Sequence, residues 1–375
     1  MFYRSGPHIL FSPPMSPEPC HSFCDGVDLE ALRLLLCDLH ATVREHLILE
    51  RARKSNDVLS SVADHTQADT IYYIDKAVEG VICDWFDARW PKEWPVDLVM
   101  EGLEDNVKFP RGVESPAVMT CIIDPIDGTR GLMYDKRAAW CLSGIAPGPA
   151  ESARLEHIAV AAMTELPTTK QWRSDQISAV RGRGLVAVGV DVRDPARPTF
   201  PVEMRPSSAK DFRHSFASFA KFFPEGRVMT SQLEETLWDR IVGIGTSPSP
   251  VIFDDQYIST GGQIYEIMCG HDRMVGDLRP YSLRAIALDG TLVCHPYDIC
   301  TEMLAREAGC VVEHPLNGPV CAPMNTVASV CWVAYANETL AGIVRPILAE
   351  LVGEIKELVP GSSGRRSFGS FGQTF

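Results

Sequence analysis

Apolar residues recur at helical spacing over three stretches of the chain. From Asp28 to about Lys54 they fall three or four positions apart, with arginine and glutamate on the opposite side, a pattern typical of a long amphipathic helix. The same pattern predicts a second helix from about Asp69 to Trp85 and a last one from Asn337 to about Leu358.

Short apolar runs between turn residues predict strands. Val96–Met100 is one such run, and Val118–Ile123 is a longer one made of apolar and β-branched residues. Glycine and proline breaks then separate runs that we interpret as an antiparallel series of strands, at Ala139–Ile145, His157–Thr164 and Ile177–Val180.

The second half of the chain is less regular. Val192–Pro206 contains four prolines and is the best candidate for a domain link. We interpret Lys210–Phe223 as a helix with an aromatic stripe, with a substrate-facing segment as the alternative. Gly261–Gly270 predicts a glycine-started helix packed on a sheet, and Tyr281–Val293 supplies strand-like apolar residues.

The composition is that of a globular protein, with 45% apolar and 22% charged residues among 375. We expect four parts: a disordered, proline-rich arm (1–24), an α+β domain with the metal site (25–195), an α/β domain with substrate-side residues (196–358), and a flexible tail (359–375). A chain of this length can bury a substantial core.

The net charge of −14 argues against nucleic acid or an anionic membrane as the partner, because both attract a basic surface. Twelve cysteines include no Cys-x-x-Cys, which favours reduced, buried thiols in a cytoplasmic protein. With no apolar stretch of membrane-spanning length and no secretory pattern, we expect neither insertion nor secretion.

The central motif begins where the apolar run at Val118–Ile123 ends. Asp124 and Asp127 stand three residues apart, with Pro125 between them. Two buried carboxylates repel each other, and Mg²⁺, which prefers oxygen ligands, removes that conflict. Pro125 fixes the backbone, so that a main-chain carbonyl can also face the metal.

Gly128 and Thr129 complete the motif. Gly128 allows a tight turn, so that backbone N–H groups can approach a phosphate at the start of the next element. The Thr129 hydroxyl can hold or polarise a water. The competing interpretations are a plain Asx turn and an aspartyl-phosphate enzyme, which needs its two acids two positions apart; the observed spacing favours a metal site.

Asp-Pro-Ile-Asp-Gly-Thr resembles the signature of the inositol monophosphatase-like family. This Mg²⁺-dependent, lithium-sensitive phosphatase superfamily includes fructose bisphosphatases and 3′-phosphonucleotide phosphatases. The resemblance spans about Asp28–Leu358, with three motifs in the family's order. It implies an α/β (α+β) fold, a layered αβαβα sandwich whose site lies between its two halves.

The resemblance also assigns acids outside the motif. Asp75 follows Asp69 by six residues, as a metal-facing helix acid does in the family, whereas the family's upstream lysine is replaced by Asp64. Glu101 directly follows the strand at 96–100 and is the expected metal ligand, with Glu104 as the alternative. Without the resemblance, this segment would be interpreted as an acidic surface loop.

A further acid opens the helix predicted from Asp298 to Gly309. As a helix N-cap, Asp298 needs no other function, but the resemblance implies that it binds a metal and orients the leaving group. Tyr297 stands where the family has tryptophan, and Glu302 where the family has a small residue. The latter difference predicts an altered substrate pocket.

The resemblance implies two metal positions. Glu101, Asp124 and the Ile126 carbonyl would hold one Mg²⁺, and Asp124, Asp127 and Asp298 would hold another. The first lowers the pKa of an attacking water, and the second stabilises the leaving oxygen.

Thr129, linked to Asp75 or Glu101, would orient that water and take its proton. Backbone N–H groups at Gly128 and Thr129 would bind a phosphoryl oxygen, with Asp298 on the leaving-group side.

The expected activity is Mg²⁺-dependent hydrolysis of a phosphate monoester, with inositol monophosphate or a related sugar phosphate as the substrate. A 3′-phosphonucleotide or another small-molecule phosphate ester is the alternative within the same chemistry. A non-catalytic module that binds metal or a phosphorylated ligand is the alternative of a different class. Relatives of this type commonly form homodimers.

Overall fold

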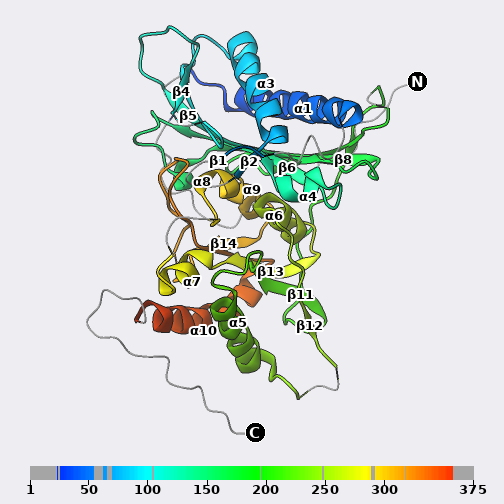
Figure 1. Cartoon of the computed structure of the whole chain (residues 1–375), viewed down its shortest axis with the longest axis vertical. Helices are drawn as coiled ribbons and strands as arrows, with labels where there is room; N and C mark the ends of the chain where they lie inside the picture. The colour runs from blue at the N-terminus through cyan, green and yellow to red at the C-terminus, as the bar shows by residue number, and fades with distance from the viewer. Residues whose placement is uncertain are drawn as a thin grey trace.

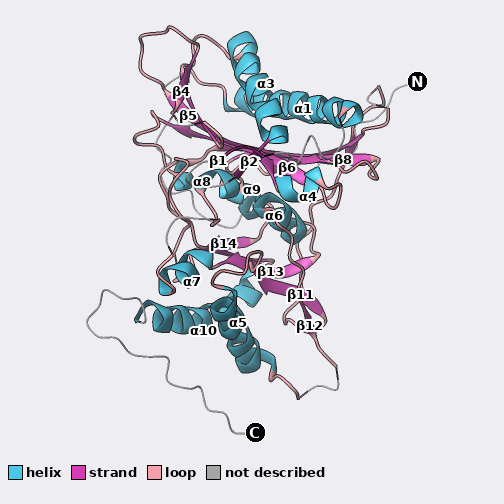
Figure 2. Ribbon diagram, in the orientation of Figure 1, coloured by secondary structure: helices cyan, strands magenta, loops and turns pink. Residues whose placement is uncertain are grey.

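The computed structural model describes residues 23, 26–54, 62–65, 70–103, 105–194, 196–246, 249–288, 292–316 and 318–357. Helices and two sheets alternate in five layers (Figures 1 and 2), so the predicted αβαβα sandwich is confirmed. The predicted arm (1–24), apart from residue 23, and the tail (359–375) lie outside the described residues.

The first layer consists of two helices, α1 (Leu29–Arg53) and α3 (Tyr73–Arg89). The Asp28 carboxylate accepts from two N–H groups of the first turn of α1, as an N-cap does. The helix α3 begins four residues later than predicted, because Thr70–Tyr72 form strand β2, which pairs with β1 (Val62–His65). Both helices bury their apolar stripes against the first sheet.

The first sheet has eight strands in the order β10-β9-β8-β7-β6-β5-β3-β4. They are β3 (Val96–Met100), β4 (Val107–Phe109), β5 (Met119–Asp127), β6 (Ala139–Pro147), β7 (Val160–Leu166), β8 (Arg173–Val180), β9 (Leu185–Asp191) and β10 (Phe200–Pro201). The predicted antiparallel series from β6 to β8 is confirmed and continues into β9 and β10. Only β3 and β5 run parallel, so their carboxyl ends meet at one edge.

The middle layer contains α6 (Thr260–Met268), α8 (Pro296–Ile299) and α9 (Glu302–Glu307). The helix predicted as α6 is confirmed. The single helix predicted from Asp298 to Gly309 is wrong, because the chain bends at Cys300 and Thr301. The bend allows α8 to lie on β5 while α9 lies on β7 and β8.

The second sheet has the order β12-β11-β13-β15-β14. Its strands are β11 (Ser215–Phe219), β12 (Ile252–Phe253), β13 (Asp272–Asp277), β14 (Val311–Glu313) and β15 (Trp332–Tyr335). β11 runs parallel to both β12 and β13, and β15 is antiparallel to β13 and β14. Three helices cover its outer face (Figure 1), α5 (Arg227–Val242), α7 (Arg279–Ala285) and α10 (Glu338–Glu357).

Two predictions in this half are wrong. Lys210–Phe223 is not an aromatic helix, because Ser215–Phe219 form the strand β11 between two parallel neighbours. Phe219 is fully buried and Phe216 is exposed, so the tertiary pairing of the strand overrides the helical spacing. Tyr281–Val293 is not a strand, because α7 starts at Arg279 with Pro280 in its first turn, where proline favours a helix.

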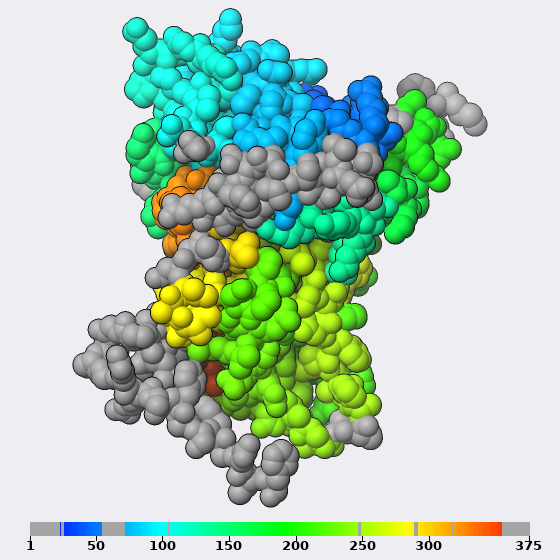
Figure 3. All heavy atoms as spheres, viewed as in Figure 1, coloured from blue at the N-terminus to red at the C-terminus, as the bar shows by residue number. Residues whose placement is uncertain are grey.

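The proposed boundary between residues 195 and 196 stays a proposal. The strand β10 lies beyond it and still belongs to the first sheet. In the space-filling view, N-terminal residues form one end of the molecule and the segment around residues 210–280 the other (Figure 3). The ten cysteines of the described residues are free thiols, and no helix there is long and apolar enough to cross a bilayer.

Gly144 in β6 tests the packing that positions α8. An added Cβ would lie 3.0 Å from the Cys300 carbonyl oxygen and 2.7 Å from Ile158 Cδ1. We expect Gly144→Ala to lower the free energy of unfolding by about 1–3 kcal/mol through overpacking, measured by urea denaturation. Gly80→Ala is the control: it sits in α3 with no atom within 4 Å of the new Cβ, so it should stabilise by roughly 0.5–1 kcal/mol. Equal midpoints would contradict this account.

Candidate active site

An irregularity in β5 brings Asp124 and Asp127 to the same side of the sheet. Residues three apart in a regular strand face opposite ways. Here the pairing of β5 with β6 shifts by one residue between these two aspartates, as in a β-bulge. The Ile126 N–H within the bulge donates to Asp124 Oδ1 at 3.0 Å, which fixes that carboxylate.

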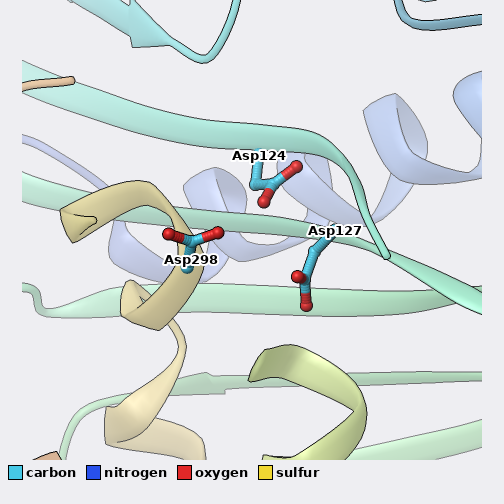
Figure 4. Close-up of side chains that lie close together, drawn as sticks. All are labelled: Asp124, Asp127 and Asp298. Atoms are coloured by element: carbon cyan, nitrogen blue, oxygen red, sulfur yellow. The ribbon is translucent and has the colours of Figure 1, made fainter. Parts of the chain in front are cut away.

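Asp298 approaches this pair from the other half of the chain. One oxygen from each of Asp124, Asp127 and Asp298 lies within 4.8 Å of the other two. Figure 4 shows the three carboxylates together, two from β5 and one from α8. Glu101, one residue beyond the parallel strand β3, lines the same pocket.

Burial makes this cluster electrostatically costly. It raises the pKa of Asp124 well above its usual range, and the negative charges of Glu101, Asp127 and Asp298 add to that shift. Burial, with the repulsion from Asp298, raises the pKa of Asp127 to about 7. Such a cluster of carboxylate oxygens suits a hard cation such as Mg²⁺, whose charge would remove the repulsion.

The N-terminus of α6 holds Asp127 in place. The Ser259 hydroxyl donates to Asp127 Oδ2 at 2.7 Å, and the Thr260 and Gly261 N–H groups donate at 3.2 and 2.5 Å. A Cβ at Gly261 would lie 3.0 Å from that carboxylate and 2.5 Å from Leu142, so only glycine fits. Ser259 and Thr260 are not among the predicted site residues, although a serine before a glycine-rich helix start is a signal for a helix N-cap.

Thr129 lies beside the cluster, at the start of α4 (Thr129–Met133). Its hydroxyl is 2.9 Å from Asp75 Oδ1 and 2.8 Å from the Ile126 carbonyl oxygen. The other Asp75 oxygen accepts from the Tyr72 N–H at 2.8 Å. Gly128 precedes α4 with φ 98°, a conformation that favours glycine.

Asp298 is not the N-cap of its helix. It is the third residue of α8, and its Oδ2 accepts from the His295 N–H at 2.5 Å. The His295 ring stacks on Tyr297 with centroids 5.2 Å apart, and both side chains are buried. The turn that carries Asp298 is therefore held from inside the fold.

The structure separates Glu302 from the pocket. Glu302 is 2% exposed and accepts from Arg306 in the same helix, so the prediction that it alters the substrate pocket is wrong. Glu104 lies outside the described residues, as does the side chain of Asp64. The remaining predicted site residues line one pocket: Asp75, Glu101, Asp124, Ile126, Asp127, Gly128, Thr129 and Asp298.

No protein-family model and no curated protein sequence matches the chain. Solved structures do match. SuhB, the extragenic suppressor protein of Bartonella henselae, superposes with a TM-score of 0.57 at 15% identity, over 85% of this chain and 98% of that one. The chain has the inositol monophosphatase and fructose-bisphosphatase fold.

Two further structures share that fold. Inositol monophosphatase II of Staphylococcus aureus matches with a TM-score of 0.53 at 15% identity, over 89% of this chain and all of that one. Fructose-1,6-bisphosphatase of Leishmania major matches with a TM-score of 0.56 at 10% identity, over 88% of this chain and 94% of that one. The resemblance inferred from Asp124–Thr129 is thus confirmed at the level of the fold.

The raised pKa of Asp127 predicts how stability depends on pH without divalent cations. The folded state binds this proton more tightly than the unfolded chain does, where the pKa is near 3.8. Its contribution to stability is therefore full below pH 4 and is lost as the pH rises to 7. We expect the free energy of unfolding in EDTA to fall by roughly 1 kcal/mol per pH unit between pH 5 and 7.

Urea denaturation of the wild type and of Asp127→Asn checks this expectation. The asparagine variant should lose much of the slope, because residue 127 then binds no proton, while Asp124, Glu101 and Asp298 still repel one another. Addition of Mg²⁺ at pH 8 should stabilise the wild type more than the variant. Parallel pH profiles for the two proteins would contradict the assignment.

Proposed function

We propose that the protein is a Mg²⁺-dependent phosphomonoesterase. The observation that carries this proposal is the convergence of Asp124, Asp127 and Asp298 within 4.8 Å, beside the hydrogen-bonded pair of Thr129 and Asp75. Buried acids that repel one another favour a bound cation, whose charge would remove the repulsion. The shared fold with phosphatases supports the proposal.

Asp124, Asp127 and Asp298, whose carboxylate oxygens lie within 4.8 Å of one another, would hold one Mg²⁺. The family resemblance implies that Glu101, Asp124 and the Ile126 carbonyl would hold a second. Bound Mg²⁺ would supply the positive charge that lowers the pKa of an attacking water and stabilises the leaving oxygen. Every donor in both sets is an oxygen, as Mg²⁺ requires.

Thr129 and Asp75 would handle the proton. A water placed against the Thr129 hydroxyl could donate its hydrogen to Oγ1, while the Thr129 hydrogen points to Asp75 Oδ1 at 2.9 Å. Asp75 is fixed by the Tyr72 N–H, so the pair is preorganised for general-base assistance.

The start of α4 would hold the phosphoryl group. The first N–H groups of a helix have no carbonyl partner within that helix, and Gly128 and Thr129 line the pocket. A water then attacks phosphorus in line with the ester oxygen. A new P–O bond forms, the ester P–O bond breaks, and the alcohol and inorganic phosphate leave without a covalent enzyme intermediate.

An inositol or sugar monophosphate is the substrate class that the resemblance implies. A 3′-phosphonucleotide is the second candidate, favoured by the aromatic side chains of Phe222 and Phe223 in the pocket. We place the activity in the cytoplasm, on a small-molecule ester.

Asp124→Asn tests the reaction. Phosphate release from a panel of monoesters should require Mg²⁺, stop with EDTA and fall with Li⁺. The variant should lose at least 100-fold in kcat, because Asp124 belongs to both proposed ligand sets, while retaining the wild-type circular dichroism spectrum. Asp194→Asn, at an exposed carboxylate, is the matched control. Full activity in Asp124→Asn would remove that ligand from the mechanism.

Thr129→Val tests the proton path, because it keeps the shape of the side chain and removes the hydroxyl. We expect kcat to fall by about 10²–10⁴-fold, the usual range for general acid–base assistance. Thr129→Ser restores the hydroxyl and should retain most of the rate. Equal losses in both variants would mean that the hydroxyl alone does not restore the rate, which would contradict the proposed proton path.

Folded protein that binds Mg²⁺ but releases phosphate from no ester would favour the non-catalytic module instead. Isothermal titration with Mg²⁺ and with inorganic phosphate separates that outcome from a failure to bind the metal.

A further inference from the structure

One buried tyrosine ties the loop before α6 to the first sheet. Tyr257 is 7% exposed and does not line the pocket. Its hydroxyl donates to the Ala138 carbonyl oxygen at 2.9 Å and accepts from Trp140 Nε1 at 3.1 Å. Ala138 directly precedes β6, and Trp140 belongs to that strand. Because a tyrosine hydroxyl can donate and accept at once, a single group joins this loop to β6.

The tyrosine is tethered beside Asp127. In the pairing of β5 with β6, Trp140 is the partner of Asp127. Ser259 lies two residues after Tyr257; its N–H donates to the Tyr257 carbonyl at 2.8 Å, and its hydroxyl donates to Asp127 Oδ2 at 2.7 Å. The contacts therefore form a closed ring from Asp127 through Trp140, Tyr257 and Ser259 back to Asp127.

The aromatic ring of Tyr257 also packs on the first turn of α6. A Cβ at Gly262 would lie 2.4 Å from atoms of that ring, so the helix approaches it as closely as glycine allows. The Arg137 guanidinium carbon lies 4.4 Å from the ring centroid. The same guanidinium donates to both carboxylate oxygens of Asp255, at 3.1 and 2.6 Å. These contacts fix the ring, and with it the start of α6, relative to β6.

Burial alone does not require a tyrosine hydroxyl to be paired in this fold. Tyr335 in β15 is 0% exposed, and its hydroxyl bonds to none of the residues that the structure describes. The Tyr257 hydroxyl, by contrast, is paired twice, and the helix start that it tethers supplies three donors to Asp127. Groups behind a metal ligand orient that ligand and change the affinity for the metal.

We infer that Tyr257 is a positioning residue for the metal site. Its hydroxyl holds the N-terminus of α6 where Ser259, Thr260 and Gly261 donate to Asp127, so that this carboxylate keeps one orientation. Without the tether the donors would shift, and ordering Asp127 would then reduce the net free energy of Mg²⁺ binding. This inference rests on the Mg²⁺ site of the proposed function and names a residue outside the pocket that sets its affinity.

Tyr257→Phe removes the hydroxyl and keeps the ring. Isothermal titration of EDTA-treated, dialysed protein with Mg²⁺ should give a Kd about tenfold higher than that of the wild type, as for other groups behind a metal ligand. Tyr335→Phe is the matched control, because it removes a buried hydroxyl that bonds to no described residue, and it should leave the Kd unchanged. With the ester that the wild type hydrolyses fastest, saturating Mg²⁺ should restore the kcat of Tyr257→Phe, which a general loss of structure would not allow.

A double-mutant cycle tests the route of the effect. In the Ser259→Ala background one donor to Asp127 is already absent. Tyr257→Phe should therefore raise the Kd for Mg²⁺ by less than about threefold in that background, because residues that act through one another are not additive. Fully additive losses would mean that Tyr257 does not act through the start of α6, and would overturn the inference.

Arg137→Gln loosens the same ring from a side chain that is 39% exposed, so this variant should fold even if Tyr257→Phe does not. We expect its Kd for Mg²⁺ to rise about threefold, in keeping with the loss of an exposed cation–π contact. Loss of a positive charge near the acids would by itself tighten Mg²⁺ binding. The sign of the change thus identifies its cause.

The outcomes distinguish the two proposals. If the wild type binds Mg²⁺ and Tyr257→Phe raises the Kd by less than about threefold, or by no more than Tyr335→Phe does, the inference is overturned and the phosphatase stands. If the wild type binds Mg²⁺ but hydrolyses no ester, the phosphatase is overturned and the Kd values still decide the role of Tyr257. No binding of Mg²⁺ by the wild type overturns both. If Tyr257→Phe does not fold, an unchanged or lower Kd in Arg137→Gln overturns the inference.

Discussion

Like charges buried together are the constraint on which this structure depends. Asp124 is almost fully buried, and its repulsion from Glu101, Asp127 and Asp298 adds to the cost of removing it from water. The fold tolerates this because donors surround the acids. The bulge in β5 supplies the Ile126 N–H, α6 supplies its N-terminus, and α8 folds back on Asp298. Those three elements come from both halves of the chain, so the site exists only when the halves are packed.

The arrangement of strands in the two sheets determines where the site lies. In the first sheet, only β3 and β5 run parallel, and their carboxyl ends deliver Glu101 and the aspartate motif. In the second sheet, the parallel pair β11 and β13 delivers Phe222, Phe223 and Arg279. The two edges meet at the pocket. The pocket therefore combines side chains from both sheets.

The fold is shared with solved structures at 10–15% identity. A fold fixes where a site lies, but its reaction and substrate depend on individual side chains. At the end of β13, Arg279 pairs with the buried Asp277 and lines the pocket.

The sequence by itself determined the local features. Helical spacing specified α1 and α10, turn residues separated β6, β7 and β8, and the motif from Asp124 to Thr129 identified the candidate metal site, because each signal lies within a few residues. Tertiary structure decided the rest. The Ser259 hydroxyl donates to Asp127, which lies 132 positions earlier in the sequence. Phe216 and Phe219 lie in a strand rather than a helix because β12 and β13 pair with their segment. Glu302 does not line the pocket; it accepts a hydrogen bond from Arg306 in the same helix. Long-range pairing and burial outweigh local propensity, and neither can be read from neighbouring residues.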